Sequence, residues 1–453
     1  MIRGGVLLFI RTAIIAAQII RRSKMKKTKI IASIVALTCT MGVLSAKPKA
    51  DSSSGKSLSG KIKVLSAMDS EAAEMTEKYF KPTHKKADVE YTSGSVEWGE
   101  FTKQEPSKVF EEESPDVIIL ESAILRKYVE SGLLLPLDDV YASVKKDVAE
   151  YPAKVASDGG HVYAMSWQVC PGAMYYRRSL AKKYLGTDDP KKVQAYFANP
   201  KKMLETARLL QSKSFGNCLL TSTIEEISGV YKGSRKQPWV VKGAITVDPA
   251  MEEYMDTAKA LTDEGLVGDT HMWWDQWLAA FRGEYVNNDG EEKEVFCTFL
   301  PTWGLHYVIK KNAPNTSGDW AICQGPTAWF NGGTWLAASK DTKNPELAKE
   351  YIKYLTSDYD CLLNYAKSSG DTVSNLKVQA ELQKKTSEPF LGGQNHYKEF
   401  CSYAKKINGS LVQSTDVDIE DIFSREVTAY INGEKTKEEA LNDFKTAAAE
   451  LLD

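Results

Sequence analysis

The feature that most constrains the fold of this chain is an alternation of apolar, strand-like segments with helix-like segments. Strands are expected at 61–67, 88–91 and 116–120, and the two intervening segments have helical character. Strands that alternate with helices require crossover connections, which indicate a parallel sheet covered on both faces. The sequence therefore predicts an α/β fold.

Acidic residues follow two of these predicted strands. Asp69 comes after the first strand, and Glu121 comes directly after the third. Because ligands gather beyond the carboxyl ends of strands in such sheets, both are candidate binding residues. Each is equally consistent with a helix N-cap or a surface acid.

Two later helices have ends that can be read from the sequence. Asp248 before Pro249 is expected to cap a helix that ends at Gly265. Thr436 and Glu439 are expected to form a capping box at the start of the last helix.

The first 46 residues differ in charge from the rest of the chain, since they contain eight Lys or Arg and no acid. From Met25, a basic start precedes 17 uncharged residues, 30–46, which is typical of a secretory signal peptide. A transmembrane anchor is the competing interpretation, although 17 residues is the lower limit for a span. We expect 1–46 to be a leader that starts at Met25 and is cleaved near Ala46.

Residues 47–60 are rich in Ser, Gly and Lys and are expected to form a flexible tether. Lys47 stands where a bacterial lipoprotein has its lipidated cysteine, which argues against a lipid anchor. The predicted location is therefore outside the cytoplasm, at the cell surface or in the extracellular or periplasmic space.

The charge balance argues against nucleic acid as a partner. The whole chain has 58 Lys and Arg against 60 Asp and Glu, and subtracting the eight leader residues leaves 50 basic residues against 60 acidic ones. An acidic surface repels phosphate backbones, and no cluster of basic and aromatic residues counteracts it.

The sequence contains no motif for a metal, a cofactor or a familiar catalytic centre. The five histidines are dispersed, and neither a complete phosphate-binding loop nor G-x-S-x-G occurs. Glu225 and Glu226 are adjacent, so on a helix they point in different directions and do not suit glycosidase chemistry. Six cysteines follow the leader, and both disulfides and buried free thiols are compatible with them: Cys170, Cys218, Cys297, Cys323, Cys361 and Cys401.

Eight short motifs occur in the order and spacing of extracellular solute-binding proteins of family 1. They are Ser114 to Ile118, Ser131 to Asp139, Asp158 to Ala164, Met174 to Arg178, Ala280 to Gly283, Gly332 to Ala337, Lys343 to Lys349 and Ile431 to Thr436. The chain resembles this family from about Lys61 to Leu452. The resemblance implies a two-lobed, periplasmic-binding-protein-like α/β fold with strands that cross between the lobes.

The resemblance also implies where the chain crosses. The crossings are expected near 167–173, 331–337 and 375–384. Lobe 1 would then comprise 60–168 plus 333–378, and lobe 2 would comprise 169–332 plus 379–453.

The function implied by the resemblance is that of a receptor for an ABC importer. Such a protein binds a carbohydrate, here expected to be an oligosaccharide, between lobes that close on it, and delivers it to the permease subunits. It is expected to be a monomer, to need no cofactor and to catalyse no reaction.

A sugar site needs flat aromatic platforms for C–H faces and polar groups for hydroxyls, because unpaired buried hydroxyls are costly. All ten tryptophans lie between Trp98 and Trp335, around the first two expected crossings. Of Trp273, Trp274 and Trp277, at most one is expected to face the ligand. The candidate binding residues are Asp69, Trp98, Glu121, Trp167, Gln168, Trp303, Gly333 and Trp335.

Two other classes of function are alternatives to a binding protein. Thiaminase I resembles these binding proteins in fold and uses a cysteine nucleophile, and Cys170 lies at the first expected crossing. A nucleophilic cysteine needs a neighbouring base and a lowered pKa, whereas a small buried residue needs neither. A cell-surface adhesin would instead require an exposed apolar patch.

Overall fold

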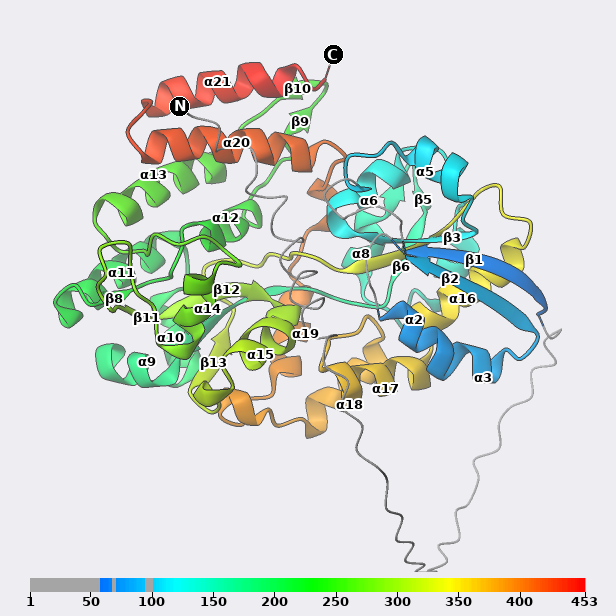
Figure 1. Ribbon diagram of the computed structural model, residues 1–453, viewed down its shortest axis with the longest axis horizontal. Coiled ribbons are helices and arrows are strands. Elements are labelled where there is room, and N and C mark those ends of the chain that lie inside the picture. Colours follow the sequence, from blue (N-terminus) through cyan, green and yellow to red (C-terminus); the bar gives the residue numbers. More distant parts are fainter. Residues whose placement is uncertain (1–57, 67–70, 94–100, 453) are drawn as a thin grey trace, which may run out of the picture.

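A computed structural model describes residues 58–66, 71–93 and 101–452. The chain forms a mixed α/β structure in which two lobes, each with its own sheet, lie side by side (Figure 1). The predicted leader, most of the predicted tether and the candidates Asp69 and Trp98 lie outside the described residues.

The first lobe contains a five-stranded sheet of order β2-β1-β3-β14-β6. Its strands are β1 (Gly60–Ser66), β2 (Ala87–Ser93), β3 (Val117–Glu121), β6 (Ala164–Ser166) and β14 (Thr334–Ala338). As predicted, β1 is parallel to β2 and β3. In contrast to a purely parallel sheet, β14 is antiparallel to β3 and β6. The cause is topological, because β14 enters the sheet as the chain returns from the second lobe.

Both faces of this sheet are buried because successive side chains of a strand point to opposite sides. Val117 and Ile119 belong to one hydrophobic cluster, whereas Ile118 and Leu120 belong to another. The helices of this lobe are α2 (Ala72–Met75), η1 (Thr76–Phe80), α3 (Lys81–Thr83), α5 (Pro106–Glu113), α6 (Ser122–Val129), α7 (Asp138–Val144), α8 (Glu150–Val155), α16 (Pro345–Ser357), α17 (Tyr359–Ser369) and α18 (Leu376–Lys385). A short hairpin joins β4 (Ser157–Asp158) to β5 (His161–Val162).

The second lobe contains a three-stranded antiparallel sheet of order β12-β7-β13. Its strands are β7 (Gly172–Arg177), β12 (Cys297–Pro301) and β13 (Trp320–Cys323). Two strand pairs accompany it, β8 (Cys218–Leu219) with β11 (Glu294–Val295) and β9 (Val240–Val241) with β10 (Ala244–Ile245).

Helices surround this smaller sheet. They are α9 (Arg178–Leu185), α10 (Pro190–Tyr196), α11 (Pro200–Ser214), α12 (Glu225–Lys232), α13 (Pro249–Asp263), α14 (Asp275–Arg282), η2 (Gly304–Ile309), α15 (Lys310–Asn312), η3 (Pro314–Thr316), η4 (Pro389–Leu391), α19 (His396–Ala404), α20 (Asp416–Ile431) and α21 (Lys437–Ala449). Between α19 and α20, η5 (Gly409–Leu411) packs on α8 of the first lobe. The helices α20 and α21 form an antiparallel pair at the outer edge of the second lobe (Figure 1).

The chain passes from the first sheet to the second between β6 and β7, and it returns between β13 and β14. The third passage was expected at 375–384, but this segment is α18, whose Val378 and Leu382 pack in a first-lobe cluster. The chain reaches a second-lobe cluster only at Phe390 and Leu391. Asn375 explains the difference, because its side chain caps α18 and also donates to the Ser357 carbonyl at 2.7 Å, which fixes this helix on the first lobe.

The expected helix caps are confirmed. The Asp248 side chain accepts a hydrogen bond from the Ala250 amide at 2.9 Å, and Gly265 adopts a φ of +63° just after α13. Thr436 and Glu439 form the reciprocal capping box at the start of α21.

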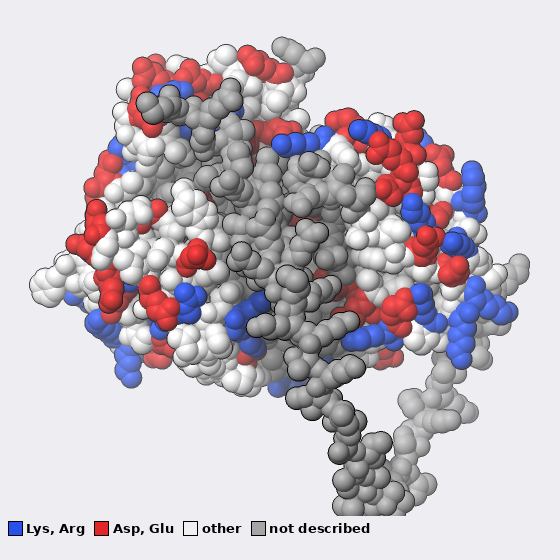
Figure 2. Space-filling model, in the orientation of Figure 1, with Lys and Arg blue, Asp and Glu red and all other residues white. Residues whose placement is uncertain are grey.

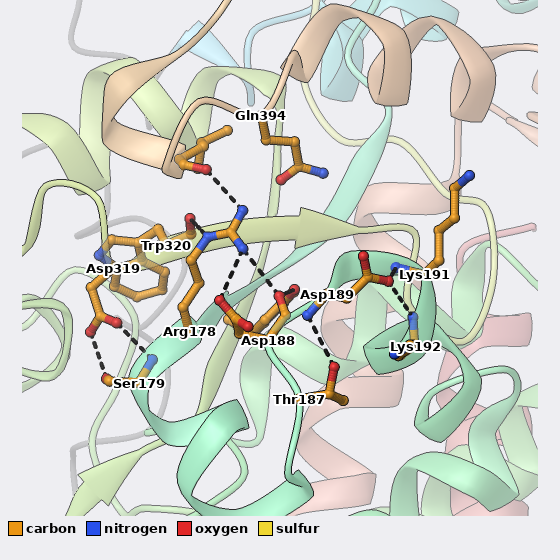
Figure 3. Close-up of polar contacts among 12 residues, drawn as sticks. Arg178, Ser179, Thr187, Asp188, Asp189, Lys191, Lys192, Asp319, Trp320 and Gln394 are labelled. Carbon is orange, nitrogen blue, oxygen red and sulfur yellow. Dashed lines mark hydrogen bonds and ion pairs between the residues drawn. The ribbon is translucent and has the colours of Figure 1, made fainter.

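Arg178 joins segments of the second lobe that are far apart in the sequence (Figure 3). Its guanidinium donates to the backbone carbonyls of Trp320 at 2.9 Å, Asp188 at 3.1 Å and Leu391 at 3.0 Å. These carbonyls belong to β13, to the loop after α9 and to η4. One side chain therefore fastens the last passage of the chain to the second sheet.

Replacing Arg178 with Met should lower the free energy of unfolding by about 2 kcal/mol, because three partly buried carbonyls lose a charged donor. Urea denaturation measures the change. Arg208→Met is the matched control, since Arg208 is exposed and pairs with Glu264, and it should cost less than about 1 kcal/mol. Equal losses in the two variants would contradict the role assigned to Arg178.

Acidic and basic side chains are interspersed over the visible faces of both lobes, and acidic ones gather near α5 and near α20 and α21 (Figure 2). Within the described ranges, no helix combines the length and apolar character that a bilayer span requires.

Candidate functional site

The first passage between the lobes hydrogen-bonds to segment 371–375, which connects α17 and α18 on the first lobe. The Val169 amide donates to the Thr372 carbonyl at 2.9 Å, and the Ser374 amide donates to the Trp167 carbonyl at 2.7 Å. Segments 167–172, 329–334 and 371–375 are together called the interlobe junction below.

The first and second passages are joined in the same way. The Asn331 amide donates to the Cys170 carbonyl at 3.2 Å, and the Gly172 amide donates to the Trp329 carbonyl at 2.8 Å. The junction lies at the carboxyl ends of the first-lobe strands, because Glu121 at the end of β3 pairs with Thr334 at the start of β14. This is the edge at which the sequence predicted a site.

A buried carboxyl lies at the centre of the junction. Asp371 accepts hydrogen bonds from Gln168 Nε2 at 2.5 Å and from the Tyr365 hydroxyl at 3.0 Å. Burial raises the pKa of Asp371 to about 6, and the nearby Glu71 carboxylate adds to the increase, whereas the hydrogen bonds oppose it. Gln168, one of the candidates, is thus held by an acid that the sequence analysis missed.

A hydrogen bond joins the lobes directly. Tyr307 of η2 donates its hydroxyl to Glu71 Oε1 at 2.9 Å, and Glu71 immediately precedes α2 in the first lobe. Partial desolvation, followed by the negative charge of Glu71, raises the pKa of Tyr307 above its usual range, although the side chain is 42% exposed. η2 comes this close because it lies against the end of α17, where a Cβ on Gly370 would be 2.2 Å from His306.

Glu121 caps α6, which confirms its expected alternative role. Its carboxylate accepts from the Ala123 amide at 2.7 Å and the Ser122 hydroxyl at 2.5 Å. Burial raises the pKa of Glu121 above its usual range. After burial, the negative charges of Asp371, Glu121 and Glu71 contribute to raising the pKa of the Cys170 thiol.

Trp303 is the candidate aromatic that is best placed beside the junction. It follows β12, is partly exposed, and donates Nε1–H to the Asn331 carbonyl at 3.2 Å. A Cβ on Gly332, which has a φ of +77°, would be 2.7 Å from Trp303 Nε1. The two-glycine segment 332–333 therefore lets the second passage approach the indole closely.

Two other candidate tryptophans lie in the core of the first lobe. Trp167 is fully buried, and Trp335 is buried with its Nε1–H donated to the Pro152 carbonyl at 3.0 Å. Gly333 has a φ of +113° and leaves room for the Trp335 ring, because a Cβ there would be 2.9 Å from it. Their contact with a ligand stays a prediction.

Of the candidates, Trp167, Gln168 and Gly333 belong to the junction, and Glu121 and Trp303 border it. With them lie Asp371, Glu71 and Tyr307, which sequence reasoning missed. No local signal marks the last three as a group, because they come from segments separated by at least 64 positions. The polar residues of 371–375, just after α17, are the sequence signal that points to Asp371.

The environment of Cys170 is unlike that of an activated nucleophile. The side chain is fully buried, and burial together with the surrounding carboxylates raises the pKa of the thiol well above its ordinary value. A thiol, not the nucleophilic thiolate, is therefore present at neutral pH. The six cysteines of the described part are buried free thiols.

Glu225 and Glu226 point in different directions, as predicted. Glu225 binds His271 and the Met272 amide, whereas Glu226 is buried and accepts from Trp277 Nε1 at 2.5 Å. Burial raises the pKa of Glu226 to about 7. Among the residues that the structure describes, no group of three or more His, Cys, Asp or Glu is placed to hold a metal ion.

Solved structures share this fold. A crystal structure of an extracellular solute-binding protein of family 1 superposes with a TM-score of 0.74 at 16% identity, over 87% of this chain and all of the other. The galacto-N-biose and lacto-N-biose I-binding protein of an ABC transporter from Bifidobacterium longum, in complex with lacto-N-biose, gives 0.67 at 18% identity, over 86% and 96%. A binding protein of B. animalis subsp. lactis, in complex with β-1,6-galactobiose, gives 0.64 at 18% identity, over 87% and 98%. These likenesses establish the two-lobed, periplasmic-binding-protein-like architecture.

Sequence comparisons agree with the fold. A probable ABC transporter-binding protein of Deinococcus radiodurans is 26% identical over 271 residues, or 54% of this chain, and the match spans 59% of that relative's length. The family model for bacterial extracellular solute-binding proteins matches residues 75–389. Since this range covers more than half of the chain, the protein belongs to the family of bacterial extracellular solute-binding proteins.

Proposed function

We propose that the protein is the substrate-binding component of an ABC importer and that it binds an oligosaccharide between its two lobes. The observation that carries this proposal is the composition of the junction. The partly exposed Trp303 binds the Asn331 carbonyl there, its neighbour Thr302 binds the Val169 carbonyl, and the preceding residue Gln168 binds the Asp371 carboxyl. An indole face suits the C–H face of a sugar, and carboxylates and amides suit its hydroxyls. The structurally similar proteins that were solved with lacto-N-biose and β-1,6-galactobiose support a carbohydrate.

Closure of the lobes on the ligand is the proposed signal to the permease. A ligand favours the closed state only through contacts that it makes better there than in the open state, so it must contact both lobes. The hydrogen bond from Tyr307 to Glu71 already links the lobes, and a saccharide bound beside it would add further contacts from each side.

The remaining features of the protein are proposed as follows. Residues 1–46 serve as a leader with its start at Met25, 47–60 form a tether, and the mature protein is an exported monomer that docks on ABC permease subunits. We propose Glu121, Gln168 and Trp303 as ligand contacts, with Asp371 orienting Gln168. The other candidates for contact are Asp69, Trp98, Trp167, Gly333 and Trp335.

A thermal-shift screen tests the proposed ligand class. Mono-, di- and trisaccharides, amino acids and short peptides are compared at equal concentration. A stabilisation confined to saccharides supports the proposal, since a ligand that binds only the folded state raises its stability. Stabilisation by amino acids or peptides alone would refute it.

Trp303→Ala should weaken binding of the stabilising saccharide by about 1–3 kcal/mol, because an aromatic anchor loses its contact area. Isothermal titration calorimetry measures the loss. The control is Tyr359→Ala. Tyr359 is an exposed aromatic residue of α17, and its loss should leave the affinity unchanged. Unchanged affinity in Trp303→Ala would remove Trp303 from the site.

The buried state of Cys170 leads to a further expectation. The native protein should react slowly with a thiol reagent at pH 8 at all six described cysteines, and rapidly once it is unfolded. Mass spectrometry after brief exposure identifies the modified positions. Rapid, selective modification of Cys170 in the native protein would instead support the thiol-dependent enzyme as the function.

A further inference from the structure

Trp273 has an unusual backbone conformation. Among the described residues, four that are not glycine have a positive φ: Ser114, Phe215, Lys242 and Trp273. Ser114 and Phe215 end α5 and α11, and Lys242 lies in the turn between β9 and β10, so each has a local geometric reason. Trp273, with a φ of +71°, is the third residue of a turn just before α14, in which the Trp274 amide donates to the His271 carbonyl at 3.2 Å, and this position usually favours Gly or Asn over a bulky residue.

A left-handed conformation is unfavourable for a bulky side chain and persists only where the surroundings fix it. Two neighbouring carboxylates of α12 do this here. Glu225 accepts from the Met272 amide at 2.9 Å and contacts His271 Nδ1 at 2.6 Å, which holds the chain before Trp273. Glu226 accepts from Trp277 Nε1 at 2.5 Å, which holds the chain after it.

The conformation brings the Trp273 indole beside Trp303. The two ring centroids are 6.0 Å apart with an interplanar angle of 16°, and Trp277 supports Trp273 from the core side at 5.1 Å. Trp273 and Trp303 are both partly exposed, whereas Trp277 is fully buried. The two nearly parallel indoles thus form an aromatic pair beside the junction, where Trp303 binds the Asn331 carbonyl.

We propose that Trp273 is a second ligand platform next to Trp303, so that the second lobe takes a saccharide of at least two pyranose rings. This inference rests on the proposed carbohydrate-binding function. One pyranose ring covers about one indole. A saccharide therefore needs two pyranose rings to contact both Trp303 and Trp273. The bonds from Glu225 and Glu226 to the chain on either side of Trp273 hold its indole in this position.

The test is calorimetry with named probes: glucose, galactose, maltose, β-1,6-galactobiose, lacto-N-biose and maltotriose. Each probe that binds the unsubstituted protein is titrated into Trp273→Ala and Trp273→Tyr. The control is Trp274→Ala, since Trp274 is exposed and belongs to neither the Trp273–Trp277 nor the Trp273–Trp303 ring pair. Near-UV circular dichroism checks that every variant is folded.

Trp273→Ala should weaken the binding of a di- or trisaccharide at least tenfold, Trp273→Tyr should lose less, and Trp274→Ala should stay within twofold. Glu225→Ala should weaken binding too, but it should add little in the Trp273→Ala background, because Glu225 acts through Trp273. If a di- or trisaccharide binds Trp273→Ala with an affinity within twofold of that for the unsubstituted protein, the inference is wrong and the proposed function still stands. The same holds if only monosaccharides bind the unsubstituted protein. If none of the probes binds, both the proposed function for these sugars and the inference are refuted.

Discussion

Gly172→Ala is expected to lower the free energy of unfolding by about 3 kcal/mol, the largest loss that we expect from adding one methyl group at the junction. A Cβ on Gly172 would lie 1.9 Å from Trp329 Cε2, with two more ring atoms within 2.4 Å. Trp329 is buried, and its carbonyl accepts the Gly172 amide at 2.8 Å, so neither the ring nor the strand has room to move. Urea denaturation measures the loss.

Gly229→Ala is a matched control because it approaches the same indole. A Cβ on Gly229 would be 3.2 Å from the Trp329 ring, and Gly229 lies within α12, where Ala is the better helix former by about 1 kcal/mol. This variant should stay within about 1 kcal/mol of the unsubstituted protein. Trp329→Leu should recover part of the stability lost in Gly172→Ala, and a Gly172→Ala protein of unchanged stability would contradict the close packing at the first passage.

Asp371→Asn is expected to change how the stability depends on pH. The folded-state pKa of Asp371 is raised from 3.8 to about 6, so the folded protein holds a proton that the unfolded chain has already released. The free energy of unfolding that this group contributes therefore falls as the pH rises from about 4 to above 6. The complete fall amounts to about 3 kcal/mol at 1.36 kcal/mol per pKa unit.

The prediction concerns the difference between the variant and the unsubstituted protein, since other buried groups titrate in both. The stability difference should move in favour of Asp371→Asn by about 2.5 kcal/mol between pH 4 and pH 8. Chemical denaturation at a series of pH values measures it. Asp88→Asn, at an exposed position, should show no such change, and a constant difference for Asp371→Asn would mean that the carboxyl is not buried in solution.

The sequence predicted the local elements well because short-range chemistry determines them. The apolar runs around Val64 and Ile118 became β1 and β3, and Thr436 with Glu439 became a capping box. The antiparallel entry of β14 was not predictable from periodicity, since strand direction depends on the route of the chain through the other lobe. The position of α18 was missed because the bond from Asn375 to Ser357 is a tertiary contact.

The candidate site was predicted less completely, for a related reason. In the sequence, a tryptophan near a crossing is equally compatible with a core position and with a ligand contact. Only the three-dimensional structure distinguishes these two roles, since it shows that Trp167 and Trp335 are buried and that Trp303 is partly exposed. Asp371 and Tyr307 belong to different lobes, and no local spacing brings them together. Their positions follow from the topology of the junction.

A crystal structure with the tightest-binding saccharide of the screen tests the central claim most directly. We predict that the sugar lies between the lobes, with one ring on Trp303 and its hydroxyls bound by polar groups of the first lobe, among them Gln168 or Glu121. A saccharide bound to one lobe only, away from Trp303 and the junction, would contradict the account.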